Sequence, residues 1–437
     1  MNKVWFGAVA DAGQLVLTRL RAGVIARLGC VGLCLAGCAD SSFQVRAPQL
    51  DEADYVRIYP YYFEFCAVSE FDKKKGIGID VDSGGPGGHS VFYLNGACRV
   101  ADAHYPQIAL CDDAGGSMLD DGVGISVNDH FSSAKWVATQ GRSFFYNGDL
   151  APGEPLAQQS YARTQARAKA MGILDGVVFH QRAVTEKPAN MAVRDYMYDV
   201  SAATDYAIGF GRDRYCARVP LDRARMARMV DYLNAQNLPY RTGEMIFEWD
   251  VLRDNCAHLA HNALTRIGLW PLWPTDRPLL VSAFDFPVPK NEFVNLMRQT
   301  NDMPIEDPTL LYDDPVARAA LLDDDLIATQ PGALAEAVRA VGDNALYNTS
   351  HLRLIFYDEP VFGHYQQDFD RIFAEPRYTD LSRNIAYFAD IYDRILARPD
   401  APAADADRAA FDRAYRAHIA RAAAQLAAAR RVLSAAR

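Results

Sequence analysis

The sequence predicts an α+β fold, with an antiparallel sheet in the first part of the chain and a mostly helical carboxyl-terminal region. Short apolar and aromatic runs separated by turn residues follow residue 50, as expected of strands in such a sheet. Apolar residues spaced three or four apart begin after residue 155 and dominate beyond residue 290, as expected of helices. Hydrophobic residues make up 50% of the 437 residues, which allows a sizeable core.

Individual elements follow from these patterns. A strong hairpin signal, Asn95-Gly96, comes directly after the apolar run 91–94. Gly268 favours the end of a helix at the residues before it. Residues 271–289 are rich in proline and tryptophan and are expected to form a loop. Strands are expected at 56–65, 76–81, 91–94, 107–111, 123–128, 143–146, 206–210 and 215–219, and helices at 155–171, 191–200, from 222 onward and at 256–267.

The last expected helix has a continuous apolar face. The last helix places apolar residues three or four positions apart, except for the final step of seven; these are Phe411, Tyr415, Ile419, Ala422, Leu426 and Leu433. We expect this helix to dock on the rest of the protein, and a helix lying on a membrane surface is the alternative.

Composition divides the chain into four expected parts. These are a signal peptide at 1–37, a tether at 38–50, a main domain at 51–290 and a helical region at 291–437.

The charge balance limits the classes of partner. The chain has 55 acidic and 45 basic residues and a formal net charge of -10. Binding to nucleic acid without sequence preference requires a basic surface. No nucleic-acid partner is therefore expected.

The amino terminus has the pattern of an export signal. Arg19, Arg21 and Arg27 precede a short apolar run that ends in Leu-Ala-Gly-Cys at Cys38. The run is too short to span a bilayer, which takes roughly 20 residues. Its ending resembles the bacterial lipoprotein signal, and a plain secretory signal or a buried apolar helix is the alternative.

The lipoprotein resemblance implies that Cys38 is lipidated and becomes the new amino terminus. The protein would then be anchored in a bacterial membrane, facing the periplasm. Ala39 follows Cys38, and Asp40 comes only after it, which in enteric lipoproteins favours the outer membrane.

Export would place the mature chain in an oxidising compartment. Two cysteines leave with the signal, Cys30 and Cys34, and Cys38 carries lipid. Five remain, which are Cys66, Cys98, Cys111, Cys216 and Cys256. An odd number predicts two disulfides and one free thiol, unless all five are buried as small apolar residues. Sequence does not set the pairing, although Cys98 and Cys111 could be hairpin neighbours.

Two short stretches carry the residue types of nucleophilic chemistry. A glycine-rich loop, 84–88, delivers His89 to the start of a strand, and Cys256 lies at the head of a helix. The positive end of the helix dipole would stabilise a thiolate and lower the pKa of the cysteine. The unpaired N–H groups of the first turn can also receive an oxyanion.

These stretches resemble the permuted papain-like superfamily of NlpC-type hydrolases and lecithin retinol acyltransferase relatives. The match consists of Gly-His-Ser-Val-Phe-Tyr-Leu at 88–94 and Asn-Cys-Ala-His at 255–258, with the histidine before the cysteine in chain order. The acyltransferases have Asn-Cys-Glu-His, so Ala257 replaces a glutamate here. The resemblance implies an antiparallel sheet packed on a cysteine-bearing helix, with insertions between the two stretches.

The resemblance also implies a set of roles. Cys256 would attack an acyl carbon, His89 would act as base and then as acid, and the backbone N–H of Cys256 would hold the oxyanion. Asp102 takes the place of the polar residue that orients the imidazole. His104 is the alternative third member, and Asn128 is a weaker one.

The expected function is that of an envelope lipoprotein with a cysteine hydrolase or acyltransferase site for an amide, ester or thioester bond. Cell-wall peptides, proteins and lipid acyl groups are all substrates of the superfamily. No cofactor is expected. A metal site at Cys256, His258 and His261 is disfavoured, because Cys256 and His258 lie about 200° apart around a helix. The non-enzymatic rival is a catalytically inactive, lipid-anchored binding or scaffold protein.

Overall fold

The computed structural model describes residues 38–40, 52–74, 88–100, 105–111, 121–282, 286–348, 355–357, 364–399 and 404–435. Its centre is a six-stranded sheet in which every pair of neighbouring strands is antiparallel. The strand order is β7 (Val137–Gln140), β6 (Gly122–Ser126), β3 (His89–Asn95), β2 (Tyr61–Val68), β8 (Arg214–Leu221) and β9 (Leu334–Val338). The α+β prediction with an antiparallel sheet is confirmed.

Two pairs of short strands lie outside this sheet. One pairs β4 (Ala97–Arg99) with β5 (Ile108–Leu110), and the other pairs β1 (Cys38–Asp40) with β10 (Ile355–Tyr357). Cys38 is thus the first residue of a strand, and its lipidation stays a prediction.

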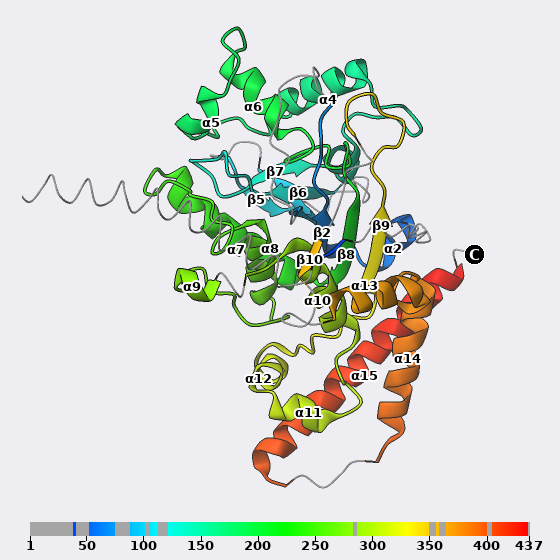
Figure 1. The fold of residues 1–437 in the computed structure, drawn as a ribbon. Coiled ribbons are helices and arrows are strands. Elements are labelled where there is room, and N and C mark those ends of the chain that lie inside the picture. Colours follow the sequence, from blue (N-terminus) through cyan, green and yellow to red (C-terminus); the bar gives the residue numbers. More distant parts are fainter. Residues whose placement is uncertain are drawn as a thin grey trace, which may run out of the picture.

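Fourteen helices of the described residues surround the sheets (Figure 1). They are α2 (Glu52–Ile58), α3 (Arg142–Asn147), α4 (Gln158–Ala170), α5 (Gln181–Thr185), α6 (Val193–Ser201), α7 (Arg223–Arg241), α8 (Cys256–Thr265), α9 (Leu279–Ser282), α10 (Pro289–Asn301), α11 (Pro308–Asp313), α12 (Pro315–Asp324), α13 (Tyr365–Ala374), α14 (Leu381–Ala397) and α15 (Ala406–Ala435). Figure 1 shows α4, α5 and α6 beyond one end of the sheet and α11, α12, α14 and α15 beyond the other. None of the helices in these described ranges is long and apolar enough to cross a membrane.

The alternation of side chains along each strand gives the sheet two different faces. On one face, Phe65 and Phe92 are directly opposite each other and belong to the core that also contains α7, α8 and α10. On the other face, Cys66 and Val91 are opposite each other and belong to the core that contains α2, α3 and α14. We call these the α8 face and the α3 face.

Most predicted elements are present, with shifted ends. The strand at 215–219, the helix that begins after Asp222 and the helix that begins at Cys256 are confirmed. Asp222 caps α7, since its side chain accepts a hydrogen bond from the N–H of Arg225. The predicted strand at 76–81 lies outside the described residues.

Three local predictions are wrong. The segment 143–146 lies in helix α3, residues 206–210 form no strand, and 56–58 belong to α2. The first of these is decided by packing: a Cβ on Gly124 would lie 2.1 Å from the Phe145 ring, so the missing side chain of Gly124 makes room for the aromatic ring of α3.

The Asn95-Gly96 turn also differs from its prediction. Gly96 has a φ of +90°, which favours glycine, but the strands on either side of it do not pair with each other. Instead β4 leaves the main sheet and pairs with β5. The glycine therefore redirects the chain from one sheet to another.

The carboxyl-terminal region is mostly helical, as predicted, and it also contains two strands, β9 and β10. Strand β9 pairs with β8 and forms an edge of the main sheet, so the two predicted parts that meet at residue 290 share this sheet. Helix α15 docks on the protein as expected, because Phe411, Tyr415 and Ile419 are buried in the core that α14 also enters.

Both predicted disulfides are formed in the structure. Cys66 and Cys216 are directly opposite each other in β2 and β8, and their sulfur atoms are joined. Cys98 and Cys111 are joined at the β4–β5 pair, as their hairpin spacing suggested. Cys256 is a free cysteine.

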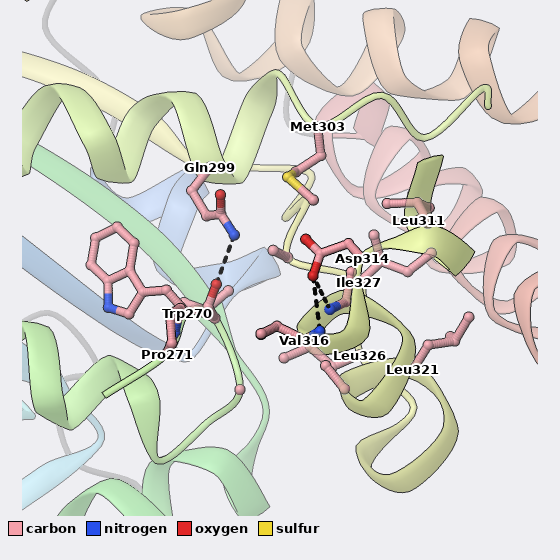
Figure 2. Close-up of a pocket in the computed structure, with 15 residues that line it drawn as sticks. Trp270, Pro271, Gln299, Met303, Leu311, Asp314, Val316, Leu321, Leu326 and Ile327 are labelled. Carbon is pink, nitrogen blue, oxygen red and sulfur yellow. Dashed lines mark hydrogen bonds between the residues drawn. The ribbon is translucent and has the colours of Figure 1, made fainter. Parts of the chain in front are cut away.

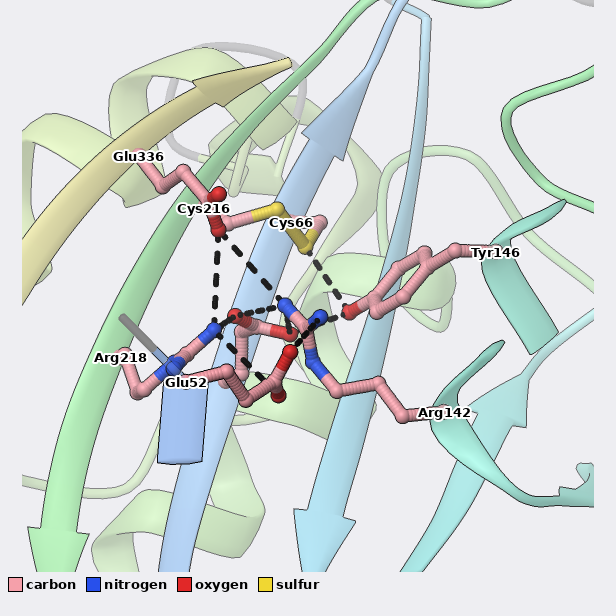
Figure 3. The surroundings of a disulfide bond; sticks show 8 residues. Glu52, Cys66, Arg142, Tyr146, Cys216, Arg218 and Glu336 are labelled. Atoms are coloured by element: carbon pink, nitrogen blue, oxygen red, sulfur yellow. Dashed lines mark hydrogen bonds and ion pairs between the residues drawn. A yellow bond between two sulfur atoms is a disulfide. The ribbon is translucent and has the colours of Figure 1, made fainter. Parts of the chain in front are cut away.

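A network of buried charges surrounds the Cys66–Cys216 bond on the α3 face (Figure 3). Glu64 is fully buried and accepts hydrogen bonds from Arg142 at 2.9 Å and Arg218 at 2.8 Å. Burial alone would raise the pKa of Glu64, but the two guanidinium charges outweigh it and hold this pKa below its ordinary value. The carboxylate of Glu64 is thus paired within the fold, while Arg142 Nε and Arg218 Nη1 have no hydrogen-bond partner.

Candidate functional site

Cys256 is held at the start of α8 by a well-formed cap. The side chain of Asn255 accepts hydrogen bonds from the N–H groups of Ala257 at 2.8 Å and His258 at 3.1 Å. In return, His258 Nδ1 accepts from the N–H of Asn255 at 3.2 Å. This reciprocal pair places Cys256 in the first turn, as the sequence predicts.

The sulfur of Cys256 contacts the beginning of strand β3. The backbone N–H of Ser90 donates to Cys256 Sγ at 3.4 Å. Strand β6 pairs with β3 only between Phe92 and Asn95, so this amide lies beyond that ladder. The end of the sheet therefore supplies a donor to the sulfur.

The pKa of Cys256 differs from its prediction. The side chain is 7% exposed, and burial raises the pKa of the thiol. Hydrogen bonds from Ser90 and the first N–H groups of α8 favour the thiolate, but they do not outweigh the loss of water. The expected lowering of the pKa is wrong, because burial overcomes the helix terminus.

His89 is the first residue of β3 and points away from the sulfur. Its Nε2 lies 3.2 Å from Ser126 Oγ, and the hydroxyl of Ser126 donates to the carbonyl of Thr204 at 2.9 Å. The oxygen of Ser126 then accepts from the imidazole, which places the ring proton on Nε2. This assignment leaves Nδ1 as the atom that can take up a proton.

The electrostatic surroundings keep His89 neutral. Burial, followed by the positive charge of Arg212, lowers the pKa of His89 to about 3. The neutral ring can accept a proton, but with this pKa it is a weak base in its resting position, because a general base works best when its pKa is near the operating pH.

The structure brings the backbones of His89 and Cys256 together but not their reacting atoms. Ser90, the residue after His89, contacts the sulfur. Alternation directs the side chain of Ser90 to the α8 face and that of His89 to the α3 face, where Ser126 lies. The hydrogen bond of the imidazole goes to Ser126, so the resting site holds no Cys–His pair.

The proposed third members have different outcomes. Asp102 and His104 lie outside the described residues. Asn128 is buried, and its amide donates to Asp205 at 3.0 Å rather than to His89.

Ser126, Thr204 and Arg212 surround His89 and were missed in the sequence. They come from β6, from the turn after α6 and from the loop before β8, and no motif or spacing connects them. Only strand pairing brings these segments to one place.

The other histidines of α8 have structural partners. His261 Nδ1 lies 2.8 Å from Glu292, and its ring stacks on Trp270 with centroids 4.4 Å apart. His258 is part of the cap. In the part of the chain that the structure describes, no group of three or more His, Cys, Asp or Glu side chains is arranged to hold a metal.

A separate cavity of about 240 Å³ lies between the ends of α8 and α10 and helices α11 and α12 (Figure 2). Its walls are mainly apolar, and Met303, Leu321 and Ile327 are among them. The carboxylate of Asp314 is used at the start of α12, where it accepts from the N–H of Val316 at 2.8 Å. This cavity contains none of the predicted site residues.

The chain was compared with protein-family models, with curated proteins and with solved structures. No family model, no curated protein and no solved structure matches it.

Proposed function

We propose that the protein is an envelope lipoprotein that transfers or hydrolyses acyl groups through the thiol of Cys256. The observation that supports this most is a free thiol in the first turn of a capped helix, in a chain where two disulfides join Cys66 to Cys216 and Cys98 to Cys111. Its sulfur receives a backbone N–H from the strand that begins with His89. The superfamily resemblance supports the same chemistry.

In the proposed reaction, the sulfur attacks the carbonyl carbon of an amide, ester or thioester. His89 takes the thiol proton at Nδ1 and returns it to the leaving group, so that a thioester on Cys256 remains. Water or an acceptor nucleophile then releases the acyl group. The backbone N–H of Cys256 helps to hold the oxyanion.

The reaction requires a change in the resting site. His89 is at the end of its strand, and its side chain must rotate away from Ser126 to bring Nδ1 to the sulfur. Because burial raises the pKa of Cys256, the thiol is protonated until a base approaches it. The proposal therefore predicts slow reaction of the thiol in the absence of an acyl compound.

The second candidate is a catalytically inactive binding or scaffold protein in the same location. This candidate is favoured by the hydrogen bond between His89 and Ser126 and by the raised pKa of Cys256. In that case Cys256 is a buried residue of the core and has no partner in catalysis.

Acylation by p-nitrophenyl acetate distinguishes the two. We expect Cys256 to be acetylated faster in the folded chain than in the urea-unfolded chain. Mass spectrometry of the tryptic peptide 254–266 measures both rates. His89→Gln should lower the rate by about 100-fold, the usual contribution of a general base. Cys256→Ser should abolish the thioester.

The matched control is His418→Gln, a histidine of α15 in the carboxyl-terminal region. It should leave the acetylation rate unchanged. Acetylation that is slower in the folded than in the unfolded chain, or that is equal in wild type and His89→Gln, would leave the scaffold function as the better description.

A further inference from the structure

Arg212 is a buried cation with unused hydrogen-bond donors. The residue is 3% exposed, and its guanidinium lies over the ring of Phe71, 4.4 Å from the centroid. Its Nε and Nη1 atoms are buried and have no hydrogen-bond partner. Buried charged groups are normally paired, so two unused donors indicate that a ligand completes this environment.

Strand pairing places Arg212 at the same end of the sheet as the candidate nucleophile. Val68 of β2 is opposite His89 on one side and opposite Arg214 on the other. Neighbouring strands are about 4.8 Å apart, so the backbones of His89 and Arg214 are separated by about 10 Å. Arg212 precedes Arg214 by two residues and extends beyond the end of β8.

The cation is within electrostatic reach of both candidate reactants. Its charge lowers the pKa of His89, and the sulfur of Cys256 is among the groups that act on the guanidinium. Arg212 therefore lies close enough to the strand that begins with His89 and to the helix that begins with Cys256 for its charge to act on both residues.

Arg214, the first residue of β8, differs from Arg212 in degree, because only its Nε atom is buried without a hydrogen-bond partner. Arg214 lies over the ring of Tyr146 at 4.3 Å, on the α3 face, where the carboxylates of Glu64 and Glu336 also act on it. The carboxylates of Asp205 and Glu70 also act on Arg212, so the difference is that Arg212 has two buried nitrogens without hydrogen-bond partners and Arg214 has one.

We propose that Arg212 binds a carboxylate of the substrate beside Cys256. This inference rests on the proposed function and names its substrate class, which is acyl compounds that carry a free carboxylate close to the bond under attack. A single guanidinium has one positive charge, which matches a carboxylate better than a phosphate dianion.

Two alkylating reagents that differ only in charge test the proposal. Iodoacetate carries a carboxylate and iodoacetamide does not, and in both reactions the sulfur displaces iodide. With an ordinary thiolate, iodoacetate is the slower reagent because the two negative charges repel. We expect the iodoacetate-to-iodoacetamide rate ratio at Cys256 to be at least about 10-fold higher in the folded than in the urea-unfolded chain.

The variants identify the residue responsible. Arg212→Gln should lower the ratio by about 10-fold, chiefly through the iodoacetate rate, and Arg212→Lys should lower it several-fold because lysine lacks the guanidinium donors. Arg223→Gln is the matched control: it removes the same charge from an exposed site at the opposite end of β8 and should leave the ratio unchanged. Alkylation is measured on the peptide 254–266.

Failure of the two proposals can be told apart. If Arg212→Gln unfolds, shown by circular dichroism, Arg212→Lys decides the result. A folded-chain ratio no higher than that of the unfolded chain, or one that the decisive variant does not lower, would overturn the carboxylate site. A ratio that depends on Arg212, combined with acetylation that does not depend on His89, would retain the anion site and reject catalysis.

Discussion

Buried charged groups in the middle of the sheet and at its end have different hydrogen-bond partners. In the middle, the carboxylate of Glu64 accepts hydrogen bonds from Arg142 and Arg218, beside two cysteines that are joined. At the end, Cys256 is a free thiol and Arg212 has two nitrogen atoms without partners. Both regions therefore have guanidinium nitrogens without partners, but in the middle a carboxylate is hydrogen-bonded to the arginines, whereas for Arg212 the proposed partner is the carboxylate of a substrate.

The largest expected effect comes from breaking the central network. Glu64→Gln keeps the shape of the side chain but leaves the charges of Arg142 and Arg218 without their shared carboxylate. We expect the free energy of unfolding to fall by about 3–5 kcal/mol, the cost of leaving buried partners unpaired. Urea unfolding followed by circular dichroism measures it.

An exposed ion pair supplies the control for this change. Glu154 pairs with Arg163 at 2.8 Å on the surface, and Glu154→Gln should have little effect on stability. Equal losses from the two variants would show that the buried network is no more important than a surface pair.

A smaller effect is expected on the pH dependence of stability, which should differ between the end of the sheet and its middle. The pKa of His89 is lowered from 6.5 to about 3, so the folded protein prefers the neutral ring. The stability from this preference is fully present above pH 6.5 and is lost as the pH falls from 6.5 toward 3. Between pH 7 and pH 5 the wild type should lose about 2 kcal/mol more than His89→Gln.

The measurement is urea unfolding of both proteins at the two pH values. The network around Glu64 does not contribute in this range, because its carboxylate has an unfolded pKa of 4.5 and a lower folded one, so its stability is lost only at more acidic pH. Parallel losses in wild type and His89→Gln would mean that the imidazole is not held neutral by the fold.

The smallest expected effect on stability is at the candidate nucleophile. Cys256→Ala removes one buried sulfur and leaves the Asn255 cap intact, so we expect a loss of about 1 kcal/mol, typical of a single substitution. The midpoint of urea unfolding measures this loss. A decrease as large as that of Glu64→Gln would indicate that Cys256 serves the core, and would weaken the distinction between the two regions.

The sequence predicts the local parts of this site well. Cys256 at a helix start, His89 at a strand start and one unpaired cysteine all follow from residues close together in the chain or from counting. Capping and strand patterns are local, and the structure retains them.

Other elements could not be predicted from local pattern. The aromatic run at 143–146 has no clear period and becomes a helix because Phe145 packs over Gly124. Strand β9 consists of Leu-Ala-Glu-Ala-Val, which is a weak strand sequence, and it forms because β8 offers an edge for pairing.

The class of fold and the position of Cys256 in a first helical turn follow from the sequence alone, which also suggested Cys98 and Cys111 as hairpin neighbours without setting the pairing. Tertiary contacts set the protonation of that thiol, the partner of His89 and the place of Arg212. Desolvation and charge depend on residues brought together from distant strands, whereas helix caps and strand starts depend on neighbours along the chain.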